Sequence, residues 1–256
     1  MDSPPDYIDD WKNYWAMRYE KRSSRELEQV ANYPLSNSLM IDIREIHPET
    51  DEFDCNIEMD DLKIHPDQIL TYALDGFKKF LDEFELGHAP LAYIDTIPIH
   101  LTGLSKLRTD RFNPAYQGGI RSMVDQLSSF TAFLESSSVL RNKPNTINYQ
   151  CNNEHETLLI QPIYTRRLID NCGVQDCSNS VFPISPGTTQ RDILKFKLRH
   201  EDEIFEGVAT GRHVDRYGRL DESEGRIRVT GIPRNVISGN SDVNLIIECL
   251  YLGGYR

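Results

Sequence analysis

Three of the five cysteines and one of the seven histidines in this 256-residue chain lie in one segment near its middle. In order they are Cys151, His155, Cys172 and Cys177, two close pairs separated by a loop. Zinc takes four sulfur or nitrogen ligands at tetrahedral angles, and proteins often supply them as two such pairs. We therefore predict a zinc site with these ligands. Four protein ligands leave no open coordination position, so the site would be structural.

Other interpretations of this segment stay open. The cysteines could be reduced thiols in a small hairpin, or Glu154 could replace His155 as a ligand. A zinc hydrolase that uses either residue at an open metal site is the catalytic alternative. The odd cysteine count, with Cys55 and Cys249 isolated, does not resemble a disulfide framework and favours metal binding in a reducing compartment. We therefore expect a cytoplasmic protein.

The acidity of the chain is concentrated at its N-terminal end. Residues 1–100 hold 9 of the 28 basic and 22 of the 40 acidic side chains, a net charge of −13, whereas the remainder carries +1. A nucleic-acid site in the later part is therefore allowed, although the whole chain carries −12. No apolar run is long enough for a membrane span, and the N-terminus lacks the pattern of a signal peptide.

Helical spacing dominates the first third of the chain. Trp11, Trp15 and Tyr19 recur at near-helical intervals, so we predict one helix over residues 6–33, with this aromatic stripe packed in a core. A strand is expected at residues 38–44. A second helix should begin at Pro66, since a proline costs little in the first turn of a helix.

Strand patterns dominate the rest. We predict strands at residues 93–101, 123–134, 147–151, 193–200 and 226–232, a weaker one at 212–217, and a hairpin around residues 238–242. About five strands fit a small barrel, for which the OB-fold is the natural candidate. The predicted class is α+β, with a helical subdomain (1–92), an OB-fold in two parts (93–145 and 183–256) and an inserted zinc-ribbon-like finger (146–182).

Basic side chains recur along the predicted strands. Lys195, Lys197 and Arg199 share one strand face, and Arg226 and Arg228 share another. Barrels of this type bind single strands with cations along the phosphate backbone. Further cations lie at strand ends or in loops, so the predicted DNA-contacting set is Arg141, Lys143, Lys195, Lys197, Arg228 and Arg234. A solvated polar face is the alternative for each of these residues.

Sequence motifs for enzyme chemistry are lacking. The chain contains no G-x-x-x-x-G-K-[ST], no G-x-G-x-x-G and no H-E-x-x-H. No serine-centred nucleophile elbow is present either, so we expect no enzymatic activity from this chain.

Taken in order, the chain resembles the N-terminal region of archaeal minichromosome maintenance (MCM) replicative helicases. The resemblance is diffuse and covers roughly residues 6–256. It is carried by WKNYW at residues 11–15, SLMIDIRE at 38–45, VLRNKP at 139–144 and RIRVTGI at 226–232. Shorter matches are Tyr33-Pro34, Phe53-Asp54, Pro66-Asp67, Ala73-Leu74 and residues 107–111.

The resemblance implies a hexameric collar that binds single-stranded and duplex DNA. It implies zinc ligands at Cys151, Cys172 and Cys177, a DNA-contacting step at Arg141 and Lys143, and Arg234 at the base of an inward hairpin. The chain departs from the family at Glu154, where a cysteine is usual, and at the hairpin tip, which has no Lys or Arg. It also ends at Arg256, where the family continues into its ATP-dependent helicase domain.

Two functions therefore follow from the resemblance. The first is the DNA-binding collar of a replicative helicase, which is non-catalytic by itself. The second is a stand-alone MCM-like protein that assembles with or regulates a full-length helicase without strong DNA binding.

Overall fold

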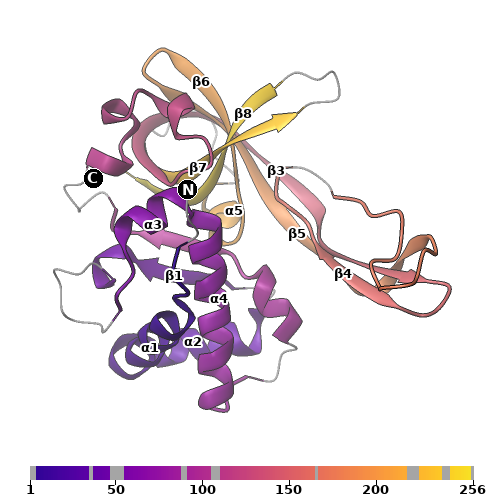
Figure 1. The fold of residues 1–256 in the computed structure, drawn as a ribbon. Coiled ribbons are helices and arrows are strands. Elements are labelled where there is room, and N and C mark those ends of the chain that lie inside the picture. The colour runs from indigo at the N-terminus through magenta and orange to yellow at the C-terminus, as the bar shows by residue number, and fades with distance from the viewer. Residues whose placement is uncertain are drawn as a thin grey trace.

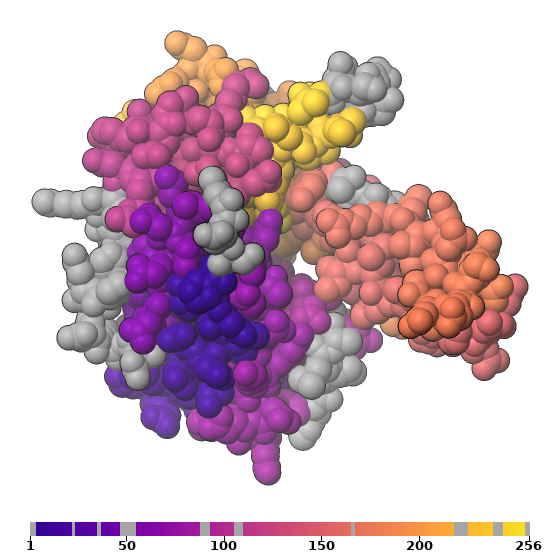
Figure 2. Space-filling view, viewed as in Figure 1, coloured from indigo at the N-terminus to yellow at the C-terminus, as the bar shows by residue number. Residues whose placement is uncertain are grey.

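A computed structural model describes residues 4–34, 37–46, 55–87, 91–104, 110–164, 167–217, 225–237 and 243–254 of the chain. It has a helical region at its N-terminal end, a sheet region after it, and a long arm that projects to one side (Figures 1 and 2). The mixed α+β class is confirmed. The predicted hairpin tip at residues 238–242 lies outside the described residues.

The helical region is built on α1 (Ile8–Arg18), α2 (Ser24–Asn32), α3 (Met59–Ile64) and α4 (Pro66–Glu83). The first prediction was one helix over residues 6–33, but a π-helical segment at Tyr19–Ser23 separates α1 from α2. The aromatic stripe is in the core as predicted, because Trp11 and Trp15 are fully buried. Trp15 also donates its indole N–H to the Ala73 carbonyl of α4 at 2.9 Å, which fixes α1 against α4.

A two-stranded parallel sheet belongs to this region. It pairs β1 (Leu39–Asp42) with β2 (Ile99–Thr102). The strand predicted over residues 93–101 is therefore only partly correct, because Leu91–Thr96 forms a 3-10 helix. Leu101 of β2 belongs to the same core cluster as Trp11 and Trp15, so β2 packs with the helices. The subdomain boundaries remain predictions.

The main sheet consists of β3 (Ser128–Cys151), β4 (Glu156–Ile160), β5 (Val181–His200), β6 (Glu203–Ala209), β7 (Arg226–Ile237) and β8 (Val243–Gly254). Its order is β4-β3-β5-β6-β8-β7, and β3 pairs with β7 as well. Five strands (β3, β5, β6, β8 and β7) therefore form a closed circuit of pairings, called the strand circuit below. A second core cluster lies within it, with Leu194, Phe196 and Val229 among its members.

One local prediction for this region was only partly correct, and another was wrong. The strand expected at residues 123–134 begins only at Ser128, after the 3-10 helix Ile120–Met123. The weak strand expected at residues 212–217 is the short helix α5 (Arg212–Tyr217), which places Val214 and Tyr217 in the core of the strand circuit. The hairpin between β7 and β8 is confirmed by antiparallel pairing out to Ile237 and Val243.

The arm is a direct continuation of the strand circuit. β3 and β5 run on beyond the circuit, pair with each other as far as Cys151 and Val181, and take β4 alongside. The pairing register shifts between Leu140 and Lys143, where Asn142 has a left-handed backbone with φ of 54°. We place the change from circuit to arm at this bulge. β3 and β5 continue from the circuit into the arm (Figure 1).

Two buried histidines meet where the helical region touches the strand circuit. His100 comes from β2 and His213 from α5, and their rings pack edge to face with centroids 4.3 Å apart. The Nδ1 atom of His100 lies 2.8 Å from the Leu250 carbonyl oxygen of β8. Burial lowers the pKa of His100 to about 4 and that of His213 to about 3. Both rings are therefore neutral in the folded protein at neutral pH.

This pair predicts a loss of stability in mild acid. Unfolded histidines bind protons below about pH 6.5, whereas in the folded protein His100 does so only near pH 4 and His213 only near pH 3. Protons therefore favour the unfolded chain as the pH falls from 6.5 toward 4. The free energy of unfolding in urea should therefore fall as the pH drops from 6.5 to 4. Replacing His213 with phenylalanine, which keeps a ring without a titrating nitrogen, should make that fall smaller. An unchanged pH dependence in the variant would contradict this.

Candidate functional site

The four predicted zinc ligands come from two tight turns at the tip of the arm. Cys151 is the last residue of β3, and its carbonyl accepts a hydrogen bond from the Glu154 N–H at 2.9 Å. In the second turn the Cys177 N–H donates to the Val174 carbonyl at 3.0 Å. Glu154 and Asp176, each just before the second ligand of its pair, have left-handed backbones with φ of 61° and 64°. Each turn thereby brings its second ligand back toward its first.

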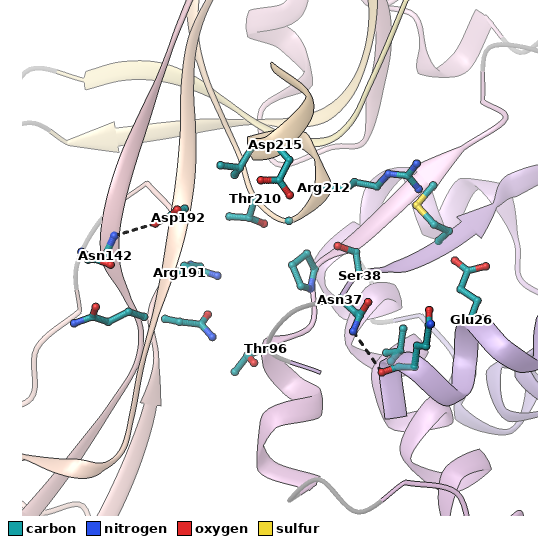
Figure 3. A pocket seen from close by; sticks show the side chains of 18 residues that line it. Glu26, Asn37, Ser38, Thr96, Asn142, Arg191, Asp192, Thr210, Arg212 and Asp215 are labelled. Carbon is teal, nitrogen blue, oxygen red and sulfur yellow. Dashed lines mark hydrogen bonds between the residues drawn. The ribbon is translucent and has the colours of Figure 1, made fainter. Parts of the chain in front are cut away.

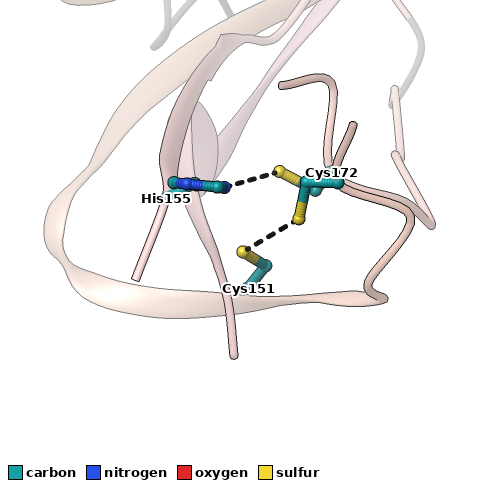
Figure 4. Close-up of side chains that lie close together, drawn as sticks. Cys151, His155 and Cys172 are labelled. Carbon is teal, nitrogen blue, oxygen red and sulfur yellow. Dashed lines mark hydrogen bonds between the residues drawn. The ribbon is translucent and has the colours of Figure 1, made fainter. Parts of the chain in front are cut away.

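The four ligand atoms converge in space. All lie within 4.8 Å of one another. The Cys151 and Cys177 Sγ atoms are 3.8 Å apart, and the Cys172 Sγ lies 3.6 Å from His155 Nδ1 (Figure 4). Tetrahedral zinc with ordinary bond lengths separates two sulfurs by about 3.8 Å and a sulfur from a nitrogen by about 3.6 Å. The donor set and both distances fit a zinc ion.

The electrostatics of the cluster also favour a cation. Burial raises the pKa of the Cys151 thiol, but the backbone N–H groups of Asn153 and His155, together with hydrogen bonds from the thiols of Cys172 and Cys177, outweigh this and lower the pKa below its usual value. The N–H of Val174 lowers the pKa of Cys172, yet burial and the neighbouring thiols outweigh it and raise that pKa. A negative charge on one cysteine therefore makes it harder to deprotonate the next cysteine. A divalent cation among them would supply the compensating charge.

His155, and not Glu154, lies with the three cysteines. The side chain of Glu154 is exposed. Several large apolar side chains around the tip are also exposed, among them Leu158, Leu168 and Phe182. The tip of the arm thus has little core of its own, which is the setting in which small structures rely on a metal.

Arg234 of β7, predicted to contact DNA, is held by three carboxylates. Its guanidinium donates to Glu248 at 2.9 Å, to Asp125 at 3.0 Å and to Asp67 of α4. Only 8% of the Arg234 side chain is exposed. Burial works against the charge, but the carboxylates outweigh it and raise the pKa of Arg234. This residue joins the helical region to β7 and β8, and each of its three guanidinium nitrogens already donates to a carboxylate.

The other predicted DNA-contacting residues lie on the surface. Lys143 and Lys197 are exposed. Lys195 lies 3.1 Å from Glu206 on the neighbouring strand β6, and Arg141 pairs with Asp192 of β5. Arg228 is half-buried on β7, opposite Thr131 of β3. Lys195 and Lys197 share one face of β5, as the alternation predicted, whereas Arg141 and Lys143 flank the bulge at the base of the arm.

The sequence did not indicate that Phe133 contacts two further arginines of the predicted strands, Arg199 and Arg226. Phe133 of β3 lies opposite Arg199 of β5 and Arg226 of β7 in the pairing register. The guanidinium carbon of Arg199 is 4.8 Å from the centre of its ring, and that of Arg226 is 5.7 Å away. The alternation of strand residues indicates which face each one occupies, but it does not indicate which strands are neighbours.

The comparisons with known proteins agree with this architecture. No family model and no curated protein sequence matches the chain. The crystal structure of the N-terminal domain of an archaeal MCM is similar to it, with a TM-score of 0.66 over 98% of this chain and 98% of that chain. The two sequences are 14% identical, so the likeness is one of fold. At that level the resemblance seen in the sequence is confirmed.

No described helix is both long and apolar enough to cross a membrane.

Proposed function

We propose that this chain is the DNA-binding, ring-forming N-terminal collar of an MCM-type replicative helicase, non-catalytic by itself. The observation that carries the proposal is the likeness to the N-terminal domain of an archaeal MCM over 98% of both chains. The partners we propose are single- and double-stranded DNA and further copies of this chain, in a hexamer. A full-length MCM helicase is a further proposed partner.

The proposal includes an OB-fold at the centre of the molecule. In support, the strand circuit pairs its neighbours antiparallel except at β6 and β8, which are parallel. A five-stranded closed sheet with one parallel pair is the arrangement of an OB barrel, and such barrels bind single strands. Zinc in the arm would then be structural, held by Cys151, His155, Cys172 and Cys177.

The DNA-contacting surface that we propose consists of Arg141, Lys143, Lys195, Lys197 and Arg228. All five residues belong to residues 101–256, whose net charge is +1, and none belongs to the acidic first hundred residues. We leave Arg234 out, because its guanidinium is bound by three carboxylates. We expect phosphates to compete with Glu206 for Lys195 and with Asp192 for Arg141, since exposed ion pairs contribute little and exchange readily.

These same ion pairs favour the second candidate function. A stand-alone MCM-like protein that assembles with a helicase without strong DNA binding needs no free cations, and both Lys195 and Arg141 already have carboxylate partners. Particle mass separates ring formation from DNA binding. We expect a hexamer-sized species with about one zinc per chain that gains mass with single-stranded DNA; a hexamer that gains none would favour the second candidate.

Removing lysines from β5 tests the proposed surface. The slope of log affinity against log salt is negative for a DNA-binding protein. Lys195→Gln and Lys197→Gln should each make this slope shallower by about 1, because each lysine neutralises about one phosphate. Fluorescence anisotropy with a labelled single strand at several salt concentrations gives this slope. Arg111→Gln is the matched control, since it removes an exposed cation that pairs with Asp60 on α3. Equal slopes in all three variants would contradict the assignment of this face.

A further inference from the structure

A cavity of about 650 Å³ separates the helical region from the base of the arm. One wall comes from α2, the start of β1 and the segment before β2, with Glu26, Ser38 and Thr96 (Figure 3). The opposite wall comes from β3, β5 and the start of α5, with Asn142, Arg191 and Thr210 among others (Figure 3). A volume of this size is typical of small-molecule sites.

Arg191 carries a partly buried positive charge on the β5 wall. Its side chain points toward the space between the two walls (Figure 3). The guanidinium donates to the Gln161 carbonyl, and its Nε–H is buried with no hydrogen-bond partner among the described residues. Burial lowers the pKa of Arg191 to about 10, and Glu248, which acts in the opposite direction, is itself hydrogen-bonded by Arg234. A largely desolvated cation without its own anion is costly, so the cavity favours an anionic group beside it.

An unpartnered acceptor lies in the same cavity. Asn145 of β3 is only 4% exposed, and in the part of the chain that the structure describes its Oδ1 atom has no hydrogen-bond partner. The lining also includes the carboxylates of Glu26, Asp215 and Asp192, the last of which pairs with Arg141. A buried acceptor and nearby carboxylates complement a ligand that donates hydrogen bonds. The cavity therefore offers a cation, Arg191, that would bind an anionic group. It also offers several oxygen acceptors that would bind hydroxyl or amino groups.

A nucleoside phosphate carries both an anionic group and hydroxyl or amino donors. We propose that this cavity binds such a ligand, with the phosphate at the Arg191 guanidinium and the sugar hydroxyls or base amino group toward Asn145. A smaller cavity of about 250 Å³ shares Arg191, Thr96 and Thr210 with it and extends the space beyond the arginine. The walls of the larger cavity come from the helical region and from the strand circuit. A ligand bound there would therefore contact both parts of the molecule. The proposal stands apart from DNA binding and does not depend on it.

Calorimetric titration of the zinc-loaded full chain tests this proposal. The probes are adenosine and guanosine mono- and diphosphates, inorganic phosphate, and the unphosphorylated nucleosides. At least one nucleotide should bind at least tenfold more tightly than both its nucleoside and inorganic phosphate. Binding of inorganic phosphate alone would reduce the site to an anion site and overturn the nucleotide assignment, as would binding of no probe.

Two variants locate the binding. Arg191→Gln removes the buried charge, and Gln29→Trp fills the cavity from an exposed position of α2 without touching Arg191. Each should weaken nucleotide binding at least tenfold, and the second keeps the test valid if the first does not fold. Arg121→Gln, which removes an exposed cation paired with Glu203, should bind like the unmodified chain. Unchanged binding in Gln29→Trp, or displacement of the nucleotide by a single-stranded oligonucleotide, would overturn the assignment.

Discussion

Replacing Cys172 with serine is expected to remove zinc from the protein and to unfold the tip of the arm. Zinc bound to four such ligands contributes about 10–16 kcal/mol in small zinc domains, and most of that is folding free energy. The tip has little else, since Leu158, Leu168 and Phe182 are exposed around it. We therefore expect the zinc content to fall from about one per chain to nearly none, with fast amide exchange in β4 and in residues 167–180.

The rest of the molecule should stay folded in that variant, because the two core clusters contain none of the four ligands. Amides of β6 to β8 should keep their protection against exchange. Cys55→Ala is the matched control, since it removes a buried thiol of the helical core and should leave the zinc content at one. A Cys172→Ser protein that keeps both its zinc and the protection of β4 would contradict the four-ligand site.

Arg234→Met is expected to destabilise the whole chain by about 3–5 kcal/mol, the usual cost of removing one partner from a buried ion pair. The large effect would come from Glu248, whose side chain is 23% exposed and would keep an unpaired charge. Asp67 and Asp125 are both 69% exposed and should contribute little once solvent screens them. Urea unfolding of the variant measures this change.

The double variant Arg234→Met with Glu248→Gln separates the lost pair from the unpaired charge. It should recover part of the stability, because the remaining side chain is neutral. Asp125→Asn, which removes an exposed partner, should change the free energy of unfolding by less than about 1 kcal/mol. If Arg234→Met instead leaves stability unchanged and weakens DNA binding, the arginine acts on DNA as the sequence predicted.

The metal cluster was predictable because its information is local. Two pairs of zinc-type ligands, each within one turn, need only that the two turns meet, and the long antiparallel pairing of β3 with β5 brings them together. The helical core was also predictable, since Trp11, Trp15 and Phe77 follow the period of a helix. The break between α1 and α2 was not, because Trp15 and Tyr19 before the polar residues 20–26, and Leu27 and Val30 after them, each keep a helical spacing.

The role of each cation depended on residues far away in the sequence. Arg234 resembles any exposed strand arginine until Asp67, 167 residues away, is placed beside it. Arg191 follows the same alternating pattern as Lys195, yet the first lies beside a cavity and the second on the surface. Alternation along a strand gives the face of a residue, but not the segment that covers that face. For this reason the chemistry of the arginines became clear only with the fold.

The salt dependence of single-stranded DNA binding tests the proposed function most directly. A strand that contacts several cations of β3, β5 and β7 releases one counterion for nearly every phosphate it neutralises. With up to five cations in the proposed surface, the slope of log affinity against log salt should be clearly negative, about −2 to −4. Binding that does not change with salt, or no binding at low salt, would contradict a DNA-binding collar.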